Sequence, residues 1–326
     1  MEIPLELIAA KQAVEWAVLA LPGVVGIGLG AREEGGELFD EPAVRILVED
    51  ATSVPELPVE IGGVSVCVIE RRYEPCSFPD EAHYPELRGG IKVGMPLRGD
   101  GTMGAIVEDT TTGELLGLSC YHVVGGPGSG FPHSVWQPAN PPLVFPVPDG
   151  NNLGEVARAD FPNVPPLPFS PVRVSMTDSA VFRLDVAAKN LRGFSRAIAG
   201  QGGPGQPDLV SAVTATAEPA FFQPVRKRGY MTGPTTGGVQ PAQIAGMWTT
   251  IKWPLEGAQN YLMHQVEIYG GGQRFCAKGD SGSLVLDAHE PTALGLLWGE
   301  ELGGTFGIMS LIGEVERQLG VSVVWA

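Results

Sequence analysis

Short apolar runs, and not long helical stripes, dominate the hydrophobic pattern from about residue 87 onward. These runs alternate with turns rich in glycine and proline, which predicts many short strands. No ten-residue helical periodicity separates them, so barrels or a sandwich are favoured over a βαβ sheet. The predicted strands are Ile91–Val93, Gly104–Glu108, Leu115–Ser119, Val181–Leu184, Val210–Thr214, Gly237–Val239, Thr249–Trp253, Gln265–Tyr269, Ser283–Leu286, Ala293–Trp298 and Phe306–Met309.

The first 80 residues have a different pattern, which predicts a small α+β unit. A helix is expected to begin near Pro4 and to stop at Pro22–Gly23. Its apolar face consists of Leu7, Ala10, Val14, Val18 and Leu21. Three runs rich in Val and Ile follow and predict strands at Gly23–Ala31, Pro42–Glu49 and Val64–Glu70.

Two further segments depart from these two patterns. The stretch between Gly125 and Pro171 is crowded with prolines and is expected to wrap the surface as extended chain. The end of the chain predicts an amphipathic helix at Leu311–Leu319, followed by a last strand at Val321–Trp325. GVVGIGLGA loosely resembles a dinucleotide fingerprint, but acidic and glycine residues follow it where that fold needs a helix.

The charge balance excludes one class of partner. Asp and Glu number 37 against 21 Lys and Arg, a net charge of -16, and such a surface repels phosphate backbones. We therefore expect no nucleic-acid partner. The short basic run Arg226–Lys227–Arg228 is expected to be a solvated strand end.

The N-terminal segment lacks the features of an export signal. Glu2 and Glu6 stand at its start, and Lys11 and Glu15 interrupt the apolar residues. No run is long enough to span a membrane. The sequence thus predicts a soluble, cytoplasmic protein without a membrane partner.

Four cysteines (Cys67, Cys76, Cys120 and Cys276) show no metal-ligand spacing. Reduced thiols are the default inside a cell, and the sequence leaves disulfide pairing open. We expect neither a metal nor an organic cofactor.

The stretch AKGDSGSLV, residues 277–285, can be a polar turn or can present Ser281 as a nucleophile. A nucleophilic serine needs a neutral imidazole to take its proton and a carboxylate to orient that imidazole. His122 follows an apolar strand at the start of a turn, where a rigid scaffold presents a base well. Of the other histidines, His83, His133 and His289 lie in polar loops or turns, while His264 begins an apolar strand and remains the alternative base.

Asp178 in SMTDSAVFRL is the carboxylate candidate, because an acid just before an apolar strand can be buried at the strand's edge. The chain order is then His122, Asp178, Ser281, which is the order of the two-barrel chymotrypsin-like design. An α/β-hydrolase elbow would need glycine where Ser283 stands.

LSCYHVV, TDSAVFRL and KGDSGSLV resemble the His, Asp and Ser motifs of trypsin-like serine peptidases. GVVGIGLG, AVRILVE, IGGVSVCVIE, RGGIKVG, VRKRGYMTGPTTGGV, GLLWG and LIGEVERQLGVSVV are similar to a bacterial, intracellular-type branch that itself resembles the plant narrow-leaf proteins. The likeness covers nearly the whole chain and is weakest in 126–172. It implies an N-terminal α+β domain (1–86) and a peptidase domain (87–326). That domain would hold two six-stranded antiparallel barrels (about 90–190 and about 205–326) and a C-terminal helix.

The resemblance also implies roles for single residues. The backbone N–H groups of Gly279 and Ser281 would form the oxyanion hole. Phe275 would floor the specificity pocket, and Leu297, Trp298 and Gly299 would line its wall. A floor without a carboxylate favours small or medium apolar side chains over Lys or Arg. The alternative is that Phe275 turns into the barrel core.

Two departures from the family pattern matter. Leu297 stands where many members carry a serine that hydrogen-bonds the catalytic Asp, so Asp178 needs other donors. In secreted relatives a newly cut N-terminus pairs with the acid that precedes the nucleophile, here Asp280. Cleavage at Arg88–Gly89 would supply such an end, but RGGIKVG reads better as the start of a strand, which leaves the partner of Asp280 open.

The sequence as a whole predicts a serine endopeptidase that cleaves protein or peptide substrates through an acyl-enzyme intermediate. The alternative is a catalytically silent trypsin-like scaffold that binds a protein partner. The sequence leaves open whether the chain forms a homo-oligomer.

Overall fold

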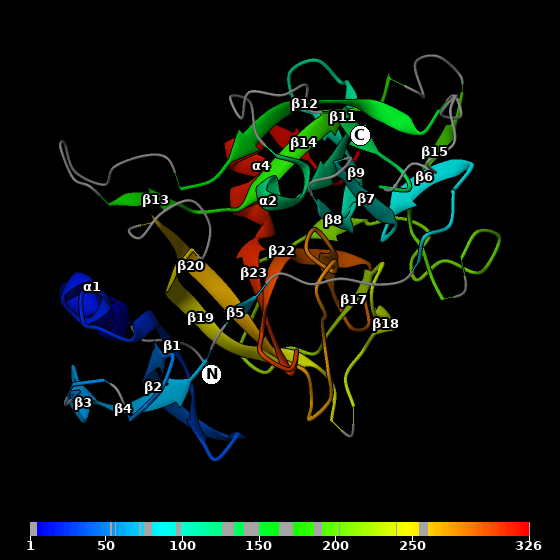
Figure 1. Cartoon of the computed structure of the whole chain (residues 1–326). Helices are drawn as coiled ribbons and strands as arrows, with labels where there is room; N and C mark the ends of the chain where they lie inside the picture. Colours follow the sequence, from blue (N-terminus) through cyan, green and yellow to red (C-terminus); the bar gives the residue numbers. More distant parts are fainter. Residues whose placement is uncertain are drawn as a thin grey trace.

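The computed structural model describes residues 5–52, 54–55, 57–71, 73–74, 80–95, 99–125, 134–139, 150–162, 172–185, 191–201, 203–238, 240–253 and 260–325. Strands make up most of its regular structure, so the prediction of a mainly β protein is confirmed. Two β bodies lie one above the other in Figure 1, and the N-terminal unit lies beside the lower one. No helix in the described ranges is long and apolar enough to cross a bilayer.

The first barrel, at the top of Figure 1, is one antiparallel sheet with the order β9-β10-β14-β12-β11-β7-β8. Its strands are β7 (Lys92–Met95), β8 (Gly99–Thr102), β9 (Ala105–Asp109), β10 (Leu115–Ser119), β11 (Ser134–Trp136), β12 (Asn152–Asp160) and β14 (Ser179–Arg183). Only Met103 and Gly104 separate β8 from β9, so the two ends of the sheet meet. Two short strands, β6 (Glu86–Gly89) and β15 (Gly193–Ile198), pair with each other beside it.

The second barrel follows the order β17-β21-β22-β23-β20-β19. Its strands are β17 (Val225–Gly229), β19 (Gln243–Lys252), β20 (Asn260–Tyr269), β21 (Leu284–Asp287), β22 (Thr292–Glu301) and β23 (Phe306–Leu311), with β18 (Gly233–Thr235) on the outer edge of β17. The N–H of Val225 donates to the carbonyl of Ala242 (2.8 Å), and the N–H of Ile244 donates to that of Gln223 (3.1 Å). These bonds join β17 to β19 and bring the ends of the six-strand order together.

The N-terminal unit extends the sheet of the second barrel. It comprises α1 (Leu5–Leu19), β1 (Val24–Glu34), β2 (Glu37–Val48), β3 (Glu60–Ile61) and β4 (Val64–Glu70). β1 pairs antiparallel with β19, so the backbone ladder runs from the barrel into the unit without a break. A Cβ atom on Gly28 would lie 2.3 Å from Thr249 Oγ1, and one on Gly30 would lie 2.6 Å from the Ala245 carbonyl oxygen. The glycines of GVVGIGLGA therefore permit close packing of two strands.

Buried ion pairs reinforce this junction. The guanidinium of Arg45, on β2, lies 2.9 Å from a carboxylate oxygen of Glu33 and 3.1 Å from one of Glu267, on β20. Arg71 adds a second cation at Glu33, at 2.6 Å. Removing one member of such a group would leave an uncompensated buried charge, which typically costs about 3–5 kcal/mol.

Shorter elements connect the two barrels. β13 (Arg173–Ser175) pairs with β20, whereas β16 (Ala215–Thr216) and β5 (Tyr73–Glu74) pair with β22. The predicted C-terminal helix is confirmed as α4 (Ile312–Leu319). The last strand is only β24 (Val321–Ser322), and it pairs with β9. The chain thus returns from the second barrel to the first.

Some sequence predictions were wrong. The Pro-rich stretch 125–171 was expected to be loop-like, but β11 and β12 within it are strands of the first barrel. No strand forms at Val210–Thr214, where the structure has one isolated bridge between Val210 and Ile198. At Gly237–Val239 there is likewise only a bridge, from Gly237 to Pro241, and Val239 lies outside the described residues.

Candidate active site

Ser281 lies on the loop that leads into β21, and two glycines shape this loop. Gly279 has φ +103°, and a Cβ there would lie 2.5 Å from the ring of Tyr230. Gly282 has φ +95°, and a Cβ there would lie 2.0 Å from the carbonyl oxygen of Thr102. Both positions need the left-handed backbone and the close approach that glycine permits.

Thr102, at the end of β8, attaches this loop to the first barrel. Its N–H donates to the carbonyl of Ser281 (2.8 Å), and its hydroxyl donates to the carbonyl of Gly279 (2.7 Å). Its own carbonyl accepts a bond from the Ser119 hydroxyl at 2.8 Å. The sequence analysis did not single out Thr102, because its role depends on a contact between chain segments 177 residues apart.

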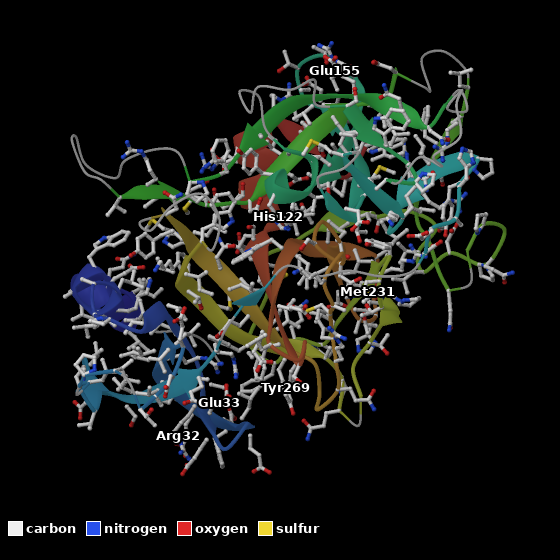
Figure 2. All side chains as sticks on the ribbon, viewed as in Figure 1. Arg32, Glu33, His122, Glu155, Met231 and Tyr269 are labelled. Carbon is white, nitrogen blue, oxygen red and sulfur yellow. The ribbon has the colours of Figure 1, made fainter. Side chains whose placement is uncertain are left out.

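His122 lies on α2 (Tyr121–Val124), the single helical turn that follows β10. Its Nδ1 lies 2.5 Å from Asp178 Oδ2, and its backbone N–H donates to Oδ1 at 3.1 Å. Asp178 precedes β14, which pairs with β10, and this pairing brings the two residues together. The carboxylate is fully buried, so it fixes the orientation of the imidazole without competition from water. Figure 2 shows His122 where the green strands of the first barrel meet the orange strands of the second.

Asp178 has a further donor that the sequence analysis did not name. The indole Nε1–H of Trp253 lies 3.3 Å from Asp178 Oδ2. Trp253 is 1% exposed and packs near Tyr121 and Phe161, whose rings stack at a centroid distance of 3.9 Å. This indole supplies the hydrogen bond that Leu297 cannot supply.

Ser281 and His122 do not share a hydrogen bond in this structure. The Ser281 hydroxyl donates to the backbone carbonyl of Trp298 at 2.9 Å. His122 Nε2 is buried and has no hydrogen-bond partner among the described residues. Proton transfer from serine to histidine therefore requires rotation of the Ser281 side chain away from Trp298. Catalytic hydrogen bonds are often formed only in the substrate complex.

The loop segments that carry Ser281 and His122 meet at the carbonyl of Leu297. This oxygen accepts the N–H of Gly282 at 2.7 Å and the thiol of Cys120 at 3.3 Å. Burial, together with the nearby carboxylate of Asp178, holds the pKa of the Cys120 thiol well above its usual value. Cys120, His122 and Asp178 place potential metal-ligand atoms within 4.8 Å of one another. The contacts within this group are those of a histidine–carboxylate pair, and the Cys120 thiol is engaged at the carbonyl of Leu297.

Asp280 has an internal cationic partner. Lys227 Nζ lies 2.5 Å from Asp280 Oδ2, and both side chains are fully buried. The Oδ2 atom also accepts the hydroxyl of Thr232 (2.6 Å), and Oδ1 accepts the N–H groups of Met231 (3.0 Å) and Thr232 (3.1 Å). The expectation that residues 226–228 form a solvated strand end was wrong. Lys227 is 0% exposed and Arg228 is 2% exposed, because each side chain pairs with a carboxylate.

The predicted oxyanion donors remain available. No hydrogen bond of the described residues uses the N–H of Gly279 or that of Ser281. The neighbouring N–H groups are engaged: that of Asp280 donates to the carbonyl of Ala277 at 2.9 Å. The loop is thus held at Asp280, which lies between these two donors, and at Gly282, whose N–H donates to the carbonyl of Leu297 at 2.7 Å.

The predicted specificity pocket needs a correction. Phe275 and Leu297 are fully buried in a core cluster of the second barrel with Val225, Ile244 and Met309. Both side chains lie in this core, as the alternative in which Phe275 turns into the barrel expects. Trp298 is 3% exposed and donates its indole N–H to Gln265 Oε1 at 2.8 Å. Gly299 lies on β22, where it pairs with Ile308 of β23.

The other histidines lie away from Ser281 in the contacts of the described residues. The His264 ring packs against Trp248 at a centroid distance of 4.7 Å, and burial lowers its pKa. His289 is exposed. His83 lies before β6, and its pKa is lowered by partial burial. His133 lies outside the described residues.

Cys67, Cys120 and Cys276 are free thiols, whereas Cys76 also lies outside the described part of the chain.

Comparison with known proteins identifies neighbours in fold only. No protein-family profile and no curated protein matches this chain. A glutamic acid specific serine protease is 13% identical, with a TM-score of 0.49 over 72% of this chain and 99% of that chain. Thermobifida fusca Protease A is 16% identical, with a TM-score of 0.48 over 74% and 100%. Cellulomonas bogoriensis chymotrypsin is 13% identical, with a TM-score of 0.45 over 74% and 100%.

These neighbours are serine proteases of the chymotrypsin fold. Likeness at this level does not assign an activity. The case for function rests on the contacts of His122, Asp178 and Ser281 in this chain.

Proposed function

We propose that this protein is a serine endopeptidase, with Ser281 as nucleophile, His122 as general base and Asp178 as the group that orients the base. The observation that carries the proposal is the bond between His122 Nδ1 and the fully buried carboxylate of Asp178, at 2.5 Å to Oδ2. A bond at Nδ1 leaves Nε2 as the atom that can accept a proton.

The chemistry follows from this tautomer. Once the Ser281 hydroxyl turns from the Trp298 carbonyl to His122 Nε2, it loses its proton to that nitrogen as the oxygen attacks the substrate carbonyl. The N–H groups of Gly279 and Ser281 would then stabilise the oxyanion. Collapse of this intermediate transfers the proton to the leaving amine and leaves an acyl-enzyme, which water hydrolyses in the reverse sequence.

Labelling with a fluorophosphonate tests the proposal, because only an activated serine reacts rapidly. We expect labelling of the pure protein at Ser281, identified by peptide mass mapping, and loss of labelling in Ser281→Ala. A protein that remains unlabelled at high reagent concentration would instead favour a catalytically silent scaffold that binds a protein partner.

A further inference from the structure

Along β22, the backbone edge that faces the Ser281 loop contacts first this loop and then β5. Leu297 pairs with the nucleophile loop, since its N–H donates to the Ser283 carbonyl at 2.9 Å. The carbonyl of Trp298 accepts the Ser281 hydroxyl. Two residues further on, Glu300 and Glu301 pair with β5. The opposite edge of β22 is taken by β23, so a strand can join β22 beyond Trp298 only on the edge that β5 now occupies.

β5 also has the direction that a peptide substrate would have. Glu74 lies opposite Glu300, and Tyr73 lies opposite Glu301, so the pairing is antiparallel. Followed from its N-terminus, β5 runs toward the Trp298 end of β22. A peptide whose scissile carbonyl lies at Ser281 and whose upstream residues extend along this edge must run in the same direction. Strand addition to a free sheet edge is a common way to hold an extended peptide, because backbone hydrogen bonds bind any sequence.

We propose that β5 occupies the subsite for the third and fourth residues upstream of the scissile bond, and that longer peptides must displace it. The register gives this position. We place the first upstream residue opposite Trp298, because the carbonyl of Trp298 lies 2.9 Å from the Ser281 hydroxyl. The second then lies opposite Gly299, and the third lies opposite Glu300, where Glu74 is now. The inference rests on the proposed function. It adds that β5 competes with the upstream residues of a peptide substrate for the same edge of β22.

The chain that follows β5 is attached to the second barrel at Asp80. Asp80 follows Glu74 by six positions in the sequence. Its N–H donates to the carbonyl of Tyr230 at 3.1 Å, and its carboxylate pairs with Arg228 on β17. A strand anchored close to its partner rebinds as an intramolecular ligand, with the high effective concentration of a short linker.

The test compares a double-proline variant with a double-alanine variant. In an antiparallel ladder, residues alternate between hydrogen-bonded and non-bonded pairs, so one of Tyr73 and Glu74 directs its N–H toward β22. Tyr73→Pro/Glu74→Pro removes that N–H whichever residue carries it. Tyr73→Ala/Glu74→Ala removes the same two side chains and keeps both N–H groups.

Catalytic efficiency is measured for peptide substrates that share their cleaved residues but extend two or six residues upstream. We expect the double-proline variant to cleave the six-residue form about tenfold faster than the wild type does, the change that corresponds to one lost backbone bond in the competitor. Efficiency on the two-residue form should stay within a factor of about two, and the double-alanine variant should match the wild type on both.

Four results would overturn the inference. Equal efficiencies of wild type and double-proline variant on the six-residue form would show that β5 does not compete. An equal gain on both substrates would show that it acts on the whole site and not on this subsite. Absence of both fluorophosphonate labelling and cleavage in every variant would remove the proposed function and the inference with it, whereas labelling without length dependence would remove the inference alone.

Discussion

Lys227 Nζ lies 2.5 Å from Asp280 Oδ2, and no surface of either side chain is exposed. The acid directly before Ser281 therefore has its counter-ion on β17 of the same chain. Arg88, the alternative cleavage point, lies within β6 and pairs with Asp208 and Glu86. Because Asp280 also binds the N–H groups of Met231 and Thr232, it joins the Ser281 loop to the turn that follows β17.

Replacement of this lysine should damage both stability and activity. Lys227→Met leaves the Asp280 carboxylate buried without a counter-ion, and we expect the free energy of unfolding to fall by about 3–5 kcal/mol. Chemical denaturation measures this loss. Lys252→Met is the matched control, because Lys252 is exposed on β19 and its replacement should change little.

A second substitution makes this prediction specific for the charge pair. Asp280→Asn in the Lys227→Met background removes the uncompensated charge, so the double variant should be more stable than Lys227→Met alone. Equal destabilisation of the single and double variants would mean that lost packing, and not the buried carboxylate, is the cause.

Substitution of the proposed triad tests the roles of its members. A triad acts as a unit, so Ser281→Ala and His122→Ala should each lower kcat by about 10⁶. Asp178→Asn should lower it by about 10⁴ by favouring the wrong imidazole tautomer. His264→Ala should retain near-native turnover, and near-native turnover in His122→Ala would transfer the role of base to His264.

Trp253 is expected to position Asp178. Trp253→Phe keeps an aromatic ring beside Tyr121 and Phe161 but removes the N–H that lies 3.3 Å from the carboxylate. A hydrogen bond to a charged group contributes about 1.5–3 kcal/mol, and this long one should lie at the lower end, so kcat should fall about tenfold.

A purely structural role for Trp253 would lower stability without changing the pH profile. Loss of a donor to Asp178 should instead move the acid limb of the kcat/KM profile, because the environment of the His122 imidazolium changes. An unchanged profile together with unchanged kcat would contradict the positioning role.

The ion pair between Asp80 and Arg228 should make stability depend on pH. Burial acts to raise the pKa of Asp80, but the hydrogen bond from Tyr84 and the Arg228 guanidinium outweigh it, so the pKa lies below its usual value. A carboxyl with a lowered pKa contributes stability above its unfolded pKa of about 3.9, and this contribution is lost as the pH falls through the folded value. The wild type should thus exceed Asp80→Asn in stability at pH 7, and the difference should shrink below pH 4. A difference that is constant across this range would exclude the linkage.

Activity should not depend on an added metal. The His122 Nδ1 atom is engaged by Asp178, and the thiol of Cys120 donates to the carbonyl of Leu297. Incubation with a chelator should leave turnover unchanged within error. Loss of activity that zinc restores, while magnesium does not, would mean that this cluster binds a metal.

Local sequence pattern was enough to predict much of this protein. Alternating apolar runs predicted most strands of both barrels, because a strand with one buried face repeats every two residues. The motifs around His122, Asp178 and Ser281 predicted a histidine–carboxylate pair, and the structure places those two residues in contact. Whether such a motif forms a turn or a strand end depends on residues that are adjacent in the chain, so the sequence is sufficient to predict it.

Contacts between distant segments were decided by the tertiary structure alone. Nothing in the local pattern indicated that Lys227 meets Asp280, that Trp253 meets Asp178, or that Thr102 meets the Ser281 loop, because each pair comes together only when the strands are assembled. The same cause explains the errors. The basic run was expected to be solvated, although each of its buried cations pairs with a carboxylate elsewhere in the fold. Phe275 was expected to line a pocket, although its side chain lies in a core. Charge and size can be read from a sequence, but the partner that neutralises a charge and the space that a side chain fills are properties of the packed fold.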